Sequence, residues 1–218
     1  MEKLFVEARY KGKINPENID INTLPETIGL FGSIQYIDFL EEIKNYLKSN
    51  KKNVRLFKLA DYEGQILGCT IKKVEGIDAI LYIGDGLFHP IALGIENYVP
   101  VYIFNPLSEK FFQLPKERIE NFKKKHKAAL AGFFSSKNIG VLVSLKKGQF
   151  NMNTVRELKK KNPDKNYYIL LFDTLYFGQL ENFSFVDCFV NTACPRISYD
   201  EHEKFNKPVV EASLILNN

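Results

Sequence analysis

The chain has 218 residues, of which 45% are hydrophobic and 26% charged, and its 30 Lys and Arg against 26 Asp and Glu give a formal charge of +4. This mixture is typical of globular domains and excludes a disordered or collagen-like chain. No apolar run approaches the roughly 18 residues that would predict a membrane span. A mildly basic pI of about 8.8 without a clustered basic face gives no reason to expect a nucleic-acid partner.

The first seven residues place acidic side chains inside a short apolar run, which is not the pattern of a signal peptide. The chain has three cysteines, and without an export signal these predict reduced thiols rather than a disulfide framework. We therefore expect a cytoplasmic protein that has no membrane partner.

Short apolar runs alternate with amphipathic stretches along the chain. We predict strands over 28–34, 54–59, 79–83, 101–104, 139–144, 167–172, 186–190 and 208–212, and helices over 36–48, 115–133 and 153–161. Strands that are apolar on both faces and separated by helices indicate parallel sheets with both faces covered. The predicted fold class is therefore α/β.

The predicted organisation is two similar domains that share a cleft, each with a small parallel four-stranded sheet flanked by helices. We expect an N-terminal strand and linker over 1–27, with the strand at 4–10. A first α/β domain over 28–114, a connecting helix within 115–138 and a second α/β domain over 139–218 follow.

The two halves resemble each other in sequence. Residues 29–33 match 140–144 at an offset of 111, residues 77–81 match 186–190 at 109, and residues 100–102 match 208–210 at 108. A duplicated domain explains this order, although strands of β-branched composition also resemble one another. With these offsets Asp85 corresponds to Cys194, just past a third strand in each half. Ligands of open parallel sheets bind at that edge, which suggests matching loops around one cleft.

Two turns after strands offer candidate ligand contacts. Gly84, Asp85 and Gly86 form a flexible turn before a helix, but His89 stands where a dinucleotide fingerprint needs its third glycine, so a Rossmann NAD site is excluded. The alternatives are a tight turn and, for His89, a residue that begins a helix. Residues 144–149 offer hydroxyl, amide and ammonium groups for a carboxylate or phosphate, or form a plain loop.

The remaining candidates are thiols and cations. Cys69 and Cys194 lie in predicted loops too far apart for a local zinc pattern, but their thiolates are soft ligands for a metal or cluster. Cys188 lies inside an apolar strand and is predicted to be a core residue. Arg196 could clamp a carboxylate or form a surface ion pair. The basic run at 123–127 suits a solvated helix face, or a docking surface for an acidic partner or RNA.

Three segments, Gly-Gln-Ile-Leu-Gly-Cys at 64–69, Gly-Asp-Gly-Leu-Phe-His at 84–89 and Asn-Thr-Ala-Cys-Pro-Arg-Ile-Ser at 191–198, resemble the diphthamide synthase family. Residues 33–35 and 144–149 are similar to two further loops of that family. The resemblance runs in order from about residue 28 to the C-terminus, and the last of the three segments is the most specific.

The resemblance implies a function. The family transfers the 3-amino-3-carboxypropyl group of S-adenosylmethionine to a histidine of elongation factor 2, by radical chemistry that depends on a 4Fe-4S cluster. Three cysteines, one from each of three similar α/β domains, hold that cluster. By position, Cys69 and Cys194 match two of these metal ligands. The resemblance further implies cofactor-binding roles for Ser33, Gln35, Gly84, Asp85, Gly86, His89, Ser144, Lys146 and Gln149. No catalytic residue is assigned.

The sequence departs from the family pattern because the first domain and its cysteine have no counterpart, and Cys188 is a poor replacement. The resemblance therefore implies a shortened accessory partner of a full-length family subunit or of a second copy of itself, with elongation factor 2 as the substrate. The alternatives are a non-catalytic binding module and a nucleoside-ligand binder that has lost the cluster.

Overall fold

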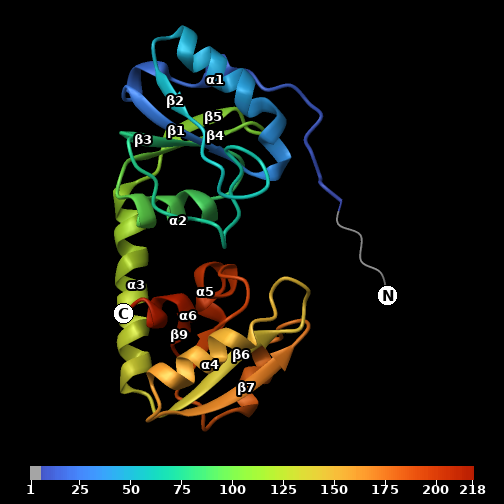
Figure 1. Cartoon of the computed structure of the whole chain (residues 1–218), viewed down its shortest axis with the longest axis vertical. Coiled ribbons are helices and arrows are strands. Elements are labelled where there is room, and N and C mark those ends of the chain that lie inside the picture. Colours follow the sequence, from blue (N-terminus) through green and yellow to red (C-terminus); the bar gives the residue numbers. More distant parts are fainter. Residues whose placement is uncertain (1–5) are drawn as a thin grey trace. The chain divides into compact units, whose positions relative to one another are not determined.

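The computed structural model describes residues 6–218, and the chain divides into two compact units, Met1–Glu120 and Asn121–Asn218 (Figure 1). The division falls within helix α3 (Lys116–Ser135), which begins in the first unit and ends in the second. Residues 6–10 form no strand, so the strand expected over 4–10 is wrong where the structure describes it, and residues 1–5 of that prediction lie outside the described range. Two short 3-10 helices, η1 (Pro16–Asn18) and η2 (Ile21–Thr23), precede the first sheet.

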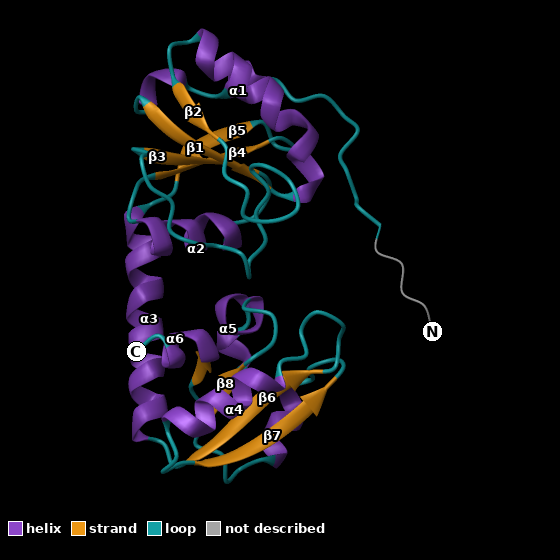
Figure 2. Cartoon of the chain, viewed as in Figure 1, coloured by secondary structure: helices purple, strands orange, loops and turns teal. Residues whose placement is uncertain are grey.

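The first unit is built on a five-stranded sheet (Figure 2). Its strands are β1 (Thr27–Gly32), β2 (Asn53–Arg55), β3 (Ala79–Ile83), β4 (Val101–Asn105) and β5 (Lys110–Gln113), in the order β2-β1-β3-β4-β5. The first four strands are parallel, as predicted, and β5 pairs antiparallel with β4. This fifth strand is absent from the prediction because its four residues are exposed or half-buried and carry no apolar run.

Helices cover both faces of the first sheet. On one face α1 (Leu40–Ser49) buries Ile43 and Leu47 against β1 and β3, and on the other α2 (Phe88–Asn97) buries Leu93. The helix predicted over 36–48 begins instead as the 3-10 helix η3 (Ile34–Phe39). Apolar spacing does not distinguish this tighter first part from an α-helix.

The second unit has a four-stranded sheet in which all strands are parallel. It comprises β6 (Asn138–Ser144), β7 (Asn166–Phe172), β8 (Cys188–Asn191) and β9 (Val209–Glu211), in the order β7-β6-β8-β9. One face packs against α3, α4 (Met152–Lys161) and α6 (Ala212–Leu216), and the other against the 3-10 helix η4 (Phe177–Asn182). The short helices α5 (Arg196–Asp200) and η5 (His202–Lys204) follow β8. The α/β class is confirmed.

The strand register confirms that the two units repeat one arrangement. In the first sheet Gly29 pairs with Ile80, which pairs with Val101. In the second, Gly140 pairs with Phe189, which pairs with Val209. These pairs reproduce the offsets of 111, 109 and 108 found in the sequence, so the similarity is one of structural position and not only of strand composition.

An aspartate joins the first and third strands in each unit. Asp78 Oδ2 accepts a hydrogen bond from the Thr27 backbone at 2.9 Å, and Asp187 Oδ2 accepts from Asn138 at 2.7 Å and Lys137 at 3.0 Å. The backbone bonds to Asn138 and Lys137 hold the pKa of Asp187 below its ordinary value. The same contact at equivalent positions fixes the register at the amino ends of both sheets.

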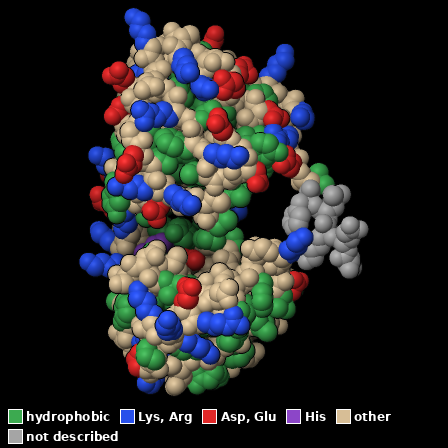
Figure 3. Space-filling view, in the orientation of Figure 1, with side chains coloured by type: hydrophobic (Ala, Val, Ile, Leu, Met, Phe, Trp, Pro, Cys, Tyr) green, Lys and Arg blue, Asp and Glu red, His purple; other side chains and the backbone are tan. Residues whose placement is uncertain are grey.

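The surface carries mixed charges, and on the face shown in Figure 3 basic and acidic side chains are interspersed. Within residues 6–218, no helix combines the length and the apolar character that crossing a membrane requires.

Replacing Asp187 by alanine is expected to lower the free energy of unfolding by about 1 kcal/mol at pH 7, because two backbone donors lose a charged acceptor at an exposed site. Since the folded-state pKa is lowered, this stabilisation is present above the ordinary pKa and is lost as the pH falls. Urea denaturation measures it, with the exposed Glu181→Ala as the control. Equal midpoints for Asp187→Ala and wild type at pH 7 would contradict the prediction.

Candidate functional site

Predicted site residues of the first unit gather at the carboxyl edge of its sheet. Ser33 follows β1, and its backbone N–H donates to the carbonyl of Ile83 at the end of β3, at 3.3 Å. Gln35, in η3, is exposed, and its backbone carbonyl accepts from Tyr10 at 2.8 Å. Because β1 and β3 are neighbours, the loops after them, which hold Ser33, Gln35 and residues 84–86, meet at one edge.

The turn after β3 is held by the Asp85 carboxylate. Asp85 Oδ1 accepts from the Gly86 backbone and from Asn105 Nδ2, both at 2.8 Å. Gly86 has φ +74°, a left-handed conformation that favours glycine. Asp85 is thus engaged in shaping the turn that begins at Gly84, which agrees with the tight-turn alternative and leaves the exposed glycine backbone at the edge.

His89 lies in the first turn of α2, beside the third strand. Its Nδ1 and the Tyr82 hydroxyl are 3.2 Å apart, within hydrogen-bond distance. Burial raises the pKa of Tyr82, so its phenol is neutral and available to donate to this nitrogen. The imidazole is therefore oriented by the sheet itself, and the prediction that His89 begins a helix is confirmed.

Cys69 reaches the same edge by a different route. The segment at 64–66 pairs with the end of β1, where Ile66 donates to the Gly32 carbonyl at 3.1 Å. A turn closed by the bond from the Thr70 N–H to the Leu67 carbonyl, at 3.0 Å, follows directly and contains the exposed Cys69. Gly68 backs onto the Phe88 ring so closely that a Cβ there would clash, which holds the cysteine turn against the start of α2.

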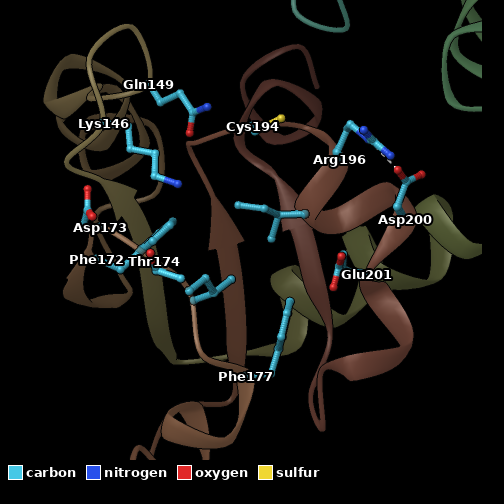
Figure 4. Close-up of a pocket in the computed structure, with 12 residues that line it drawn as sticks. Lys146, Gln149, Phe172, Asp173, Thr174, Phe177, Cys194, Arg196, Asp200 and Glu201 are labelled. Atoms are coloured by element: carbon cyan, nitrogen blue, oxygen red, sulfur yellow. Dashed lines mark hydrogen bonds and ion pairs between the residues drawn. The ribbon is translucent and has the colours of Figure 1, made fainter. Parts of the chain in front are cut away.

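The corresponding edge of the second unit contains a cavity of about 400 Å³ (Figure 4). Four candidate residues line it: Lys146 and Gln149 from the loop after β6, Cys194 from the loop after β8, and Arg196 at the start of α5. The other lining residues are Phe172, Asp173, Thr174, Leu175, Phe177, Ile197, Asp200 and Glu201. The structure thus places a thiol, an amide and an ammonium group, all from residues singled out in the sequence, at one cavity.

The loop after β6 is shaped by a buried serine. Ser144 is fully buried, and its Oγ accepts from the Lys146 backbone at 3.2 Å. The Gln149 N–H donates to the Lys146 carbonyl at 3.0 Å, and Gly148 supplies the positive φ of +83° that the turn requires. Ser144 therefore supports the loop, while Lys146 and Gln149 present their side chains to the cavity.

Charges of both signs surround the cavity. Arg196 Nε contacts Asp200 Oδ2 at 2.6 Å, which confirms the ion-pair alternative for this arginine. Lys146, Asp173 and Glu201 add further charged groups. This lining suits a polar ligand that carries both an acidic and a basic group.

Sequence reasoning missed a buried polar group beneath the Cys194 loop. Glu211, at the end of β9, is 6% exposed, and its Oε1 accepts a 2.6 Å hydrogen bond from Asn191 Nδ2. Burial raises the pKa of Glu211 to about 8, against the opposing effect of the Asn191 bond. An acidic residue inside the otherwise apolar run 208–212 was the available signal.

The cysteines offer an incomplete ligand set for an iron–sulfur cluster. Among the described residues no three Cys, His, Asp or Glu side chains are grouped as a metal site. Cys188 is confirmed as a core residue, because it is fully buried and burial raises its pKa to about 12. Cys69 and Cys194 lie in separate units on accessible loops. The thiols fit a cluster chemically, but two are fewer than the three or four that such clusters take.

The basic run at 123–127 lies on α3. Lys125 Nζ is 2.7 Å from His202 Nε2 and 3.6 Å from a Glu203 carboxylate oxygen, while Lys124 and Lys127 are exposed. His126 is turned inward, and burial lowers its pKa to about 4. The run is thus mostly a solvated helix face, with one histidine packed against Phe122 and Tyr199.

Comparison with known proteins places these features in a family. Residues 3–217 match the family described as "Putative diphthamide synthesis protein". The chain belongs to that family. The match extends over both units and includes every candidate site residue.

Relatives from two organisms illustrate the similarity. The chain is 32% identical to the 2-(3-amino-3-carboxypropyl)histidine synthase of Methanocaldococcus jannaschii, with 94% of the chain and 65% of the relative aligned. It resembles the crystal structure of Dph2 from Pyrococcus horikoshii with a TM-score of 0.79 and 29% identity, covering 90% of the chain and 58% of that protein. A second Pyrococcus horikoshii Dph2 structure, which contains a 4Fe-4S cluster, gives a TM-score of 0.78 at 29% identity over 91% of the chain and 59% of that protein. The chain thus spans about three fifths of the length of these relatives.

Replacing Glu211 by glutamine is expected to change the pH dependence of stability. Because the folded-state pKa is raised to about 8, ionisation opposes folding, and this cost grows as the pH rises from about 5 to 8, by at most about 1.4 kcal/mol per pH unit. Denaturation at several pH values should show Glu211→Gln gaining on wild type toward pH 8, whereas Glu181→Gln, at an exposed carboxylate, should not. Parallel stability curves for wild type and Glu211→Gln would refute this.

Proposed function

We propose that this chain is a subunit of a 2-(3-amino-3-carboxypropyl)histidine synthase. In this proposal it takes part in transferring the 3-amino-3-carboxypropyl group of S-adenosylmethionine to a histidine of elongation factor 2. It does so as an accessory partner of a longer family subunit. The observation that carries the proposal is the placement of Cys194 in the wall of a cavity with Lys146 and Gln149.

In the proposed complex Cys69 and Cys194 are ligands of a 4Fe-4S cluster. Both are on loops at the carboxyl edge of parallel strands; Cys69 is exposed and Cys194 is half-buried in the wall of the cavity, whereas Cys188 is fully buried. When bound, such a cluster supplies one electron for cleavage of the carbon–sulfur bond in S-adenosylmethionine. The longer subunit provides the third thiolate, which completes the ligand set of the cluster.

The remaining predicted residues have binding roles in this proposal. Lys146 and Gln149 present an ammonium and an amide group, which suit the carboxylate of an amino acid such as the methionine part of the cofactor. In the first unit, the turn at 84–86, exposed at Gly86, gives close backbone approach to a nucleoside. Ser33 and Gln35 lie beside that turn. The contact between His89 and Tyr82 ties the first turn of α2 to the third strand.

One observation favours a second candidate, a non-catalytic binding module. The described residues supply two thiolates rather than three, so the chain could support a catalytic partner without holding a cluster itself. The two candidates differ in whether iron depends on Cys69 and Cys194.

Anaerobic reconstitution with iron and sulfide tests the proposal, in the presence of a full-length family subunit that keeps only the cluster cysteine for which this chain has no counterpart. We expect about four irons per complex. Cys69→Ala or Cys194→Ala should abolish the bound iron and the EPR signal of the reduced cluster, because each removes an accessible thiolate. Cys188→Ala is the matched control and should leave both unchanged, since that thiol is fully buried.

The same variants are then assayed with an unmodified full-length subunit for aminocarboxypropyl transfer to elongation factor 2. Loss of transfer with Cys194→Ala supports the cluster-binding subunit. Iron content and transfer that do not depend on either accessible cysteine would overturn it in favour of the binding module. Reconstitution by two copies of this chain alone would instead identify the partner as a second copy.

A further inference from the structure

A buried polar pair lies beneath the Cys194 loop. Asn191 ends β8 and Glu211 ends β9, and the two are paired by the strand register. Their exposed fractions are 0% and 6%. Burying an amide and a carboxyl group costs free energy unless their hydrogen bonds are made, so the contacts of this pair indicate what it is for.

The Asn191 side chain connects Glu211 to the loop. Its Nδ2 lies 2.6 Å from Glu211 Oε1, 2.9 Å from the Cys194 carbonyl oxygen and 3.3 Å from Ser198 Oγ. An amide nitrogen carries two hydrogens, and the two shorter contacts account for both. Asn191 Oδ1 accepts from the Ala193 backbone at 3.0 Å, so one side chain holds the loop at two successive residues.

The Cys194 carbonyl is fixed from two directions. Besides Asn191 Nδ2, the Ile197 backbone N–H donates to it at 3.0 Å, at the start of α5. With the carbonyl directed into the protein, the Cys194 side chain lines the cavity. Glu211 is linked to the Cys194 loop through Asn191. Its Oε1 atom fixes the orientation of the Asn191 amide, and that amide binds the Cys194 carbonyl.

The first unit shows that the fold does not require this pair. The positions equivalent to Asn191 and Glu211 are Tyr82 and Ile103, which are paired in the same register and buried in an apolar cluster. The loop residue equivalent to Cys194 there is Asp85. The Asn–Glu pair therefore occurs in the unit whose third-strand loop carries a thiol, and strand pairing alone is satisfied by a tyrosine and an isoleucine.

We propose that Glu211 is a positioning residue for Cys194: by fixing the Asn191 amide, it sets the direction in which the Cys194 thiol enters the cavity. The value of this for cluster binding rests on the proposed function, but the positioning itself is measurable on the thiol without iron. Since burial raises the pKa of Glu211 to about 8, the carboxyl is largely neutral at pH 7, and its carbonyl oxygen suffices as the acceptor.

The test is the alkylation rate of Cys194 relative to Cys69, measured by iodoacetamide labelling and mass spectrometry on the reduced, iron-free full chain. Cys69 is exposed and lies in the other unit, so it is an internal reference. The variant Glu211→Ile introduces isoleucine, which the first unit has at the equivalent position, Ile103. This variant leaves one buried Asn191 amide hydrogen without its acceptor, so Tm is measured alongside and is expected to fall. The Cys194 to Cys69 ratio should rise about threefold or more as the loop opens locally.

Two variants separate positioning from general destabilisation. Glu211→Gln keeps a carbonyl oxygen as acceptor and should restore the wild-type ratio. Val210→Ala is the matched control, because Val210 is 1% exposed on the same strand but packs in the apolar core rather than against the loop. It should lower Tm without changing the ratio.

An unchanged ratio in folded Glu211→Ile would overturn the positioning role, as would an equal rise in Val210→Ala. If Glu211→Ile does not fold, Glu211→Ala carries the same expected rise and the same refutation. A chain that passes this labelling test but never binds iron with a full-length subunit would refute the proposed function alone. The two failures are therefore distinguishable.

Discussion

The arrangement of the candidate sites depends on parallel pairing between the first and third strands of each unit. Parallel neighbours end at the same edge, so loops that are about 50 residues apart in sequence meet there. In the first unit β1 and β3 bring Ser33 to the turn at 84–86, and in the second β6 and β8 bring Lys146 to Cys194. A slip of one residue would exchange the side chains between the two packed faces of a sheet and shift the loops at its carboxyl edge, so the aspartate contacts at the opposite edge have a direct bearing on the site.

The equivalence of the two units also shows where they have diverged. Asp85 and Cys194 occupy the same position, yet the carboxylate is engaged by Gly86 and Asn105 while the thiol lines a cavity. The accessible thiol of the first unit is instead Cys69, which arrives from the loop before the third strand. One scaffold thus presents a cysteine at its carboxyl edge by two different routes, and this edge is what the units share.

Much of this could be predicted from the sequence, since both sheets consist of apolar runs whose period and spacing are distinctive. The 79–83 strand agrees to the residue, and the offsets of the repeat correspond to the strand register. The features that escaped prediction depend on tertiary contacts. Strand β5 is stabilised by its pairing with β4 and not by an apolar run of its own. The 3-10 helix η3 differs from an α-helix by a hydrogen-bond pattern that apolar spacing does not encode.

The role of Glu211 could not be predicted for a related reason, because it depends on Asn191, its neighbour across the sheet. In sequence it is one acid after two valines, and an exposed strand end would account for it. Only the pairing of Asn191 with Glu211 shows that the carboxyl is buried and linked to the Cys194 carbonyl. Such a group raises the free energy of the fold as it ionises, and the first unit uses Ile103 at the same position. The second unit has the destabilising Glu211 at a position where the first unit has an apolar isoleucine. The orientation of the Cys194 loop explains this difference.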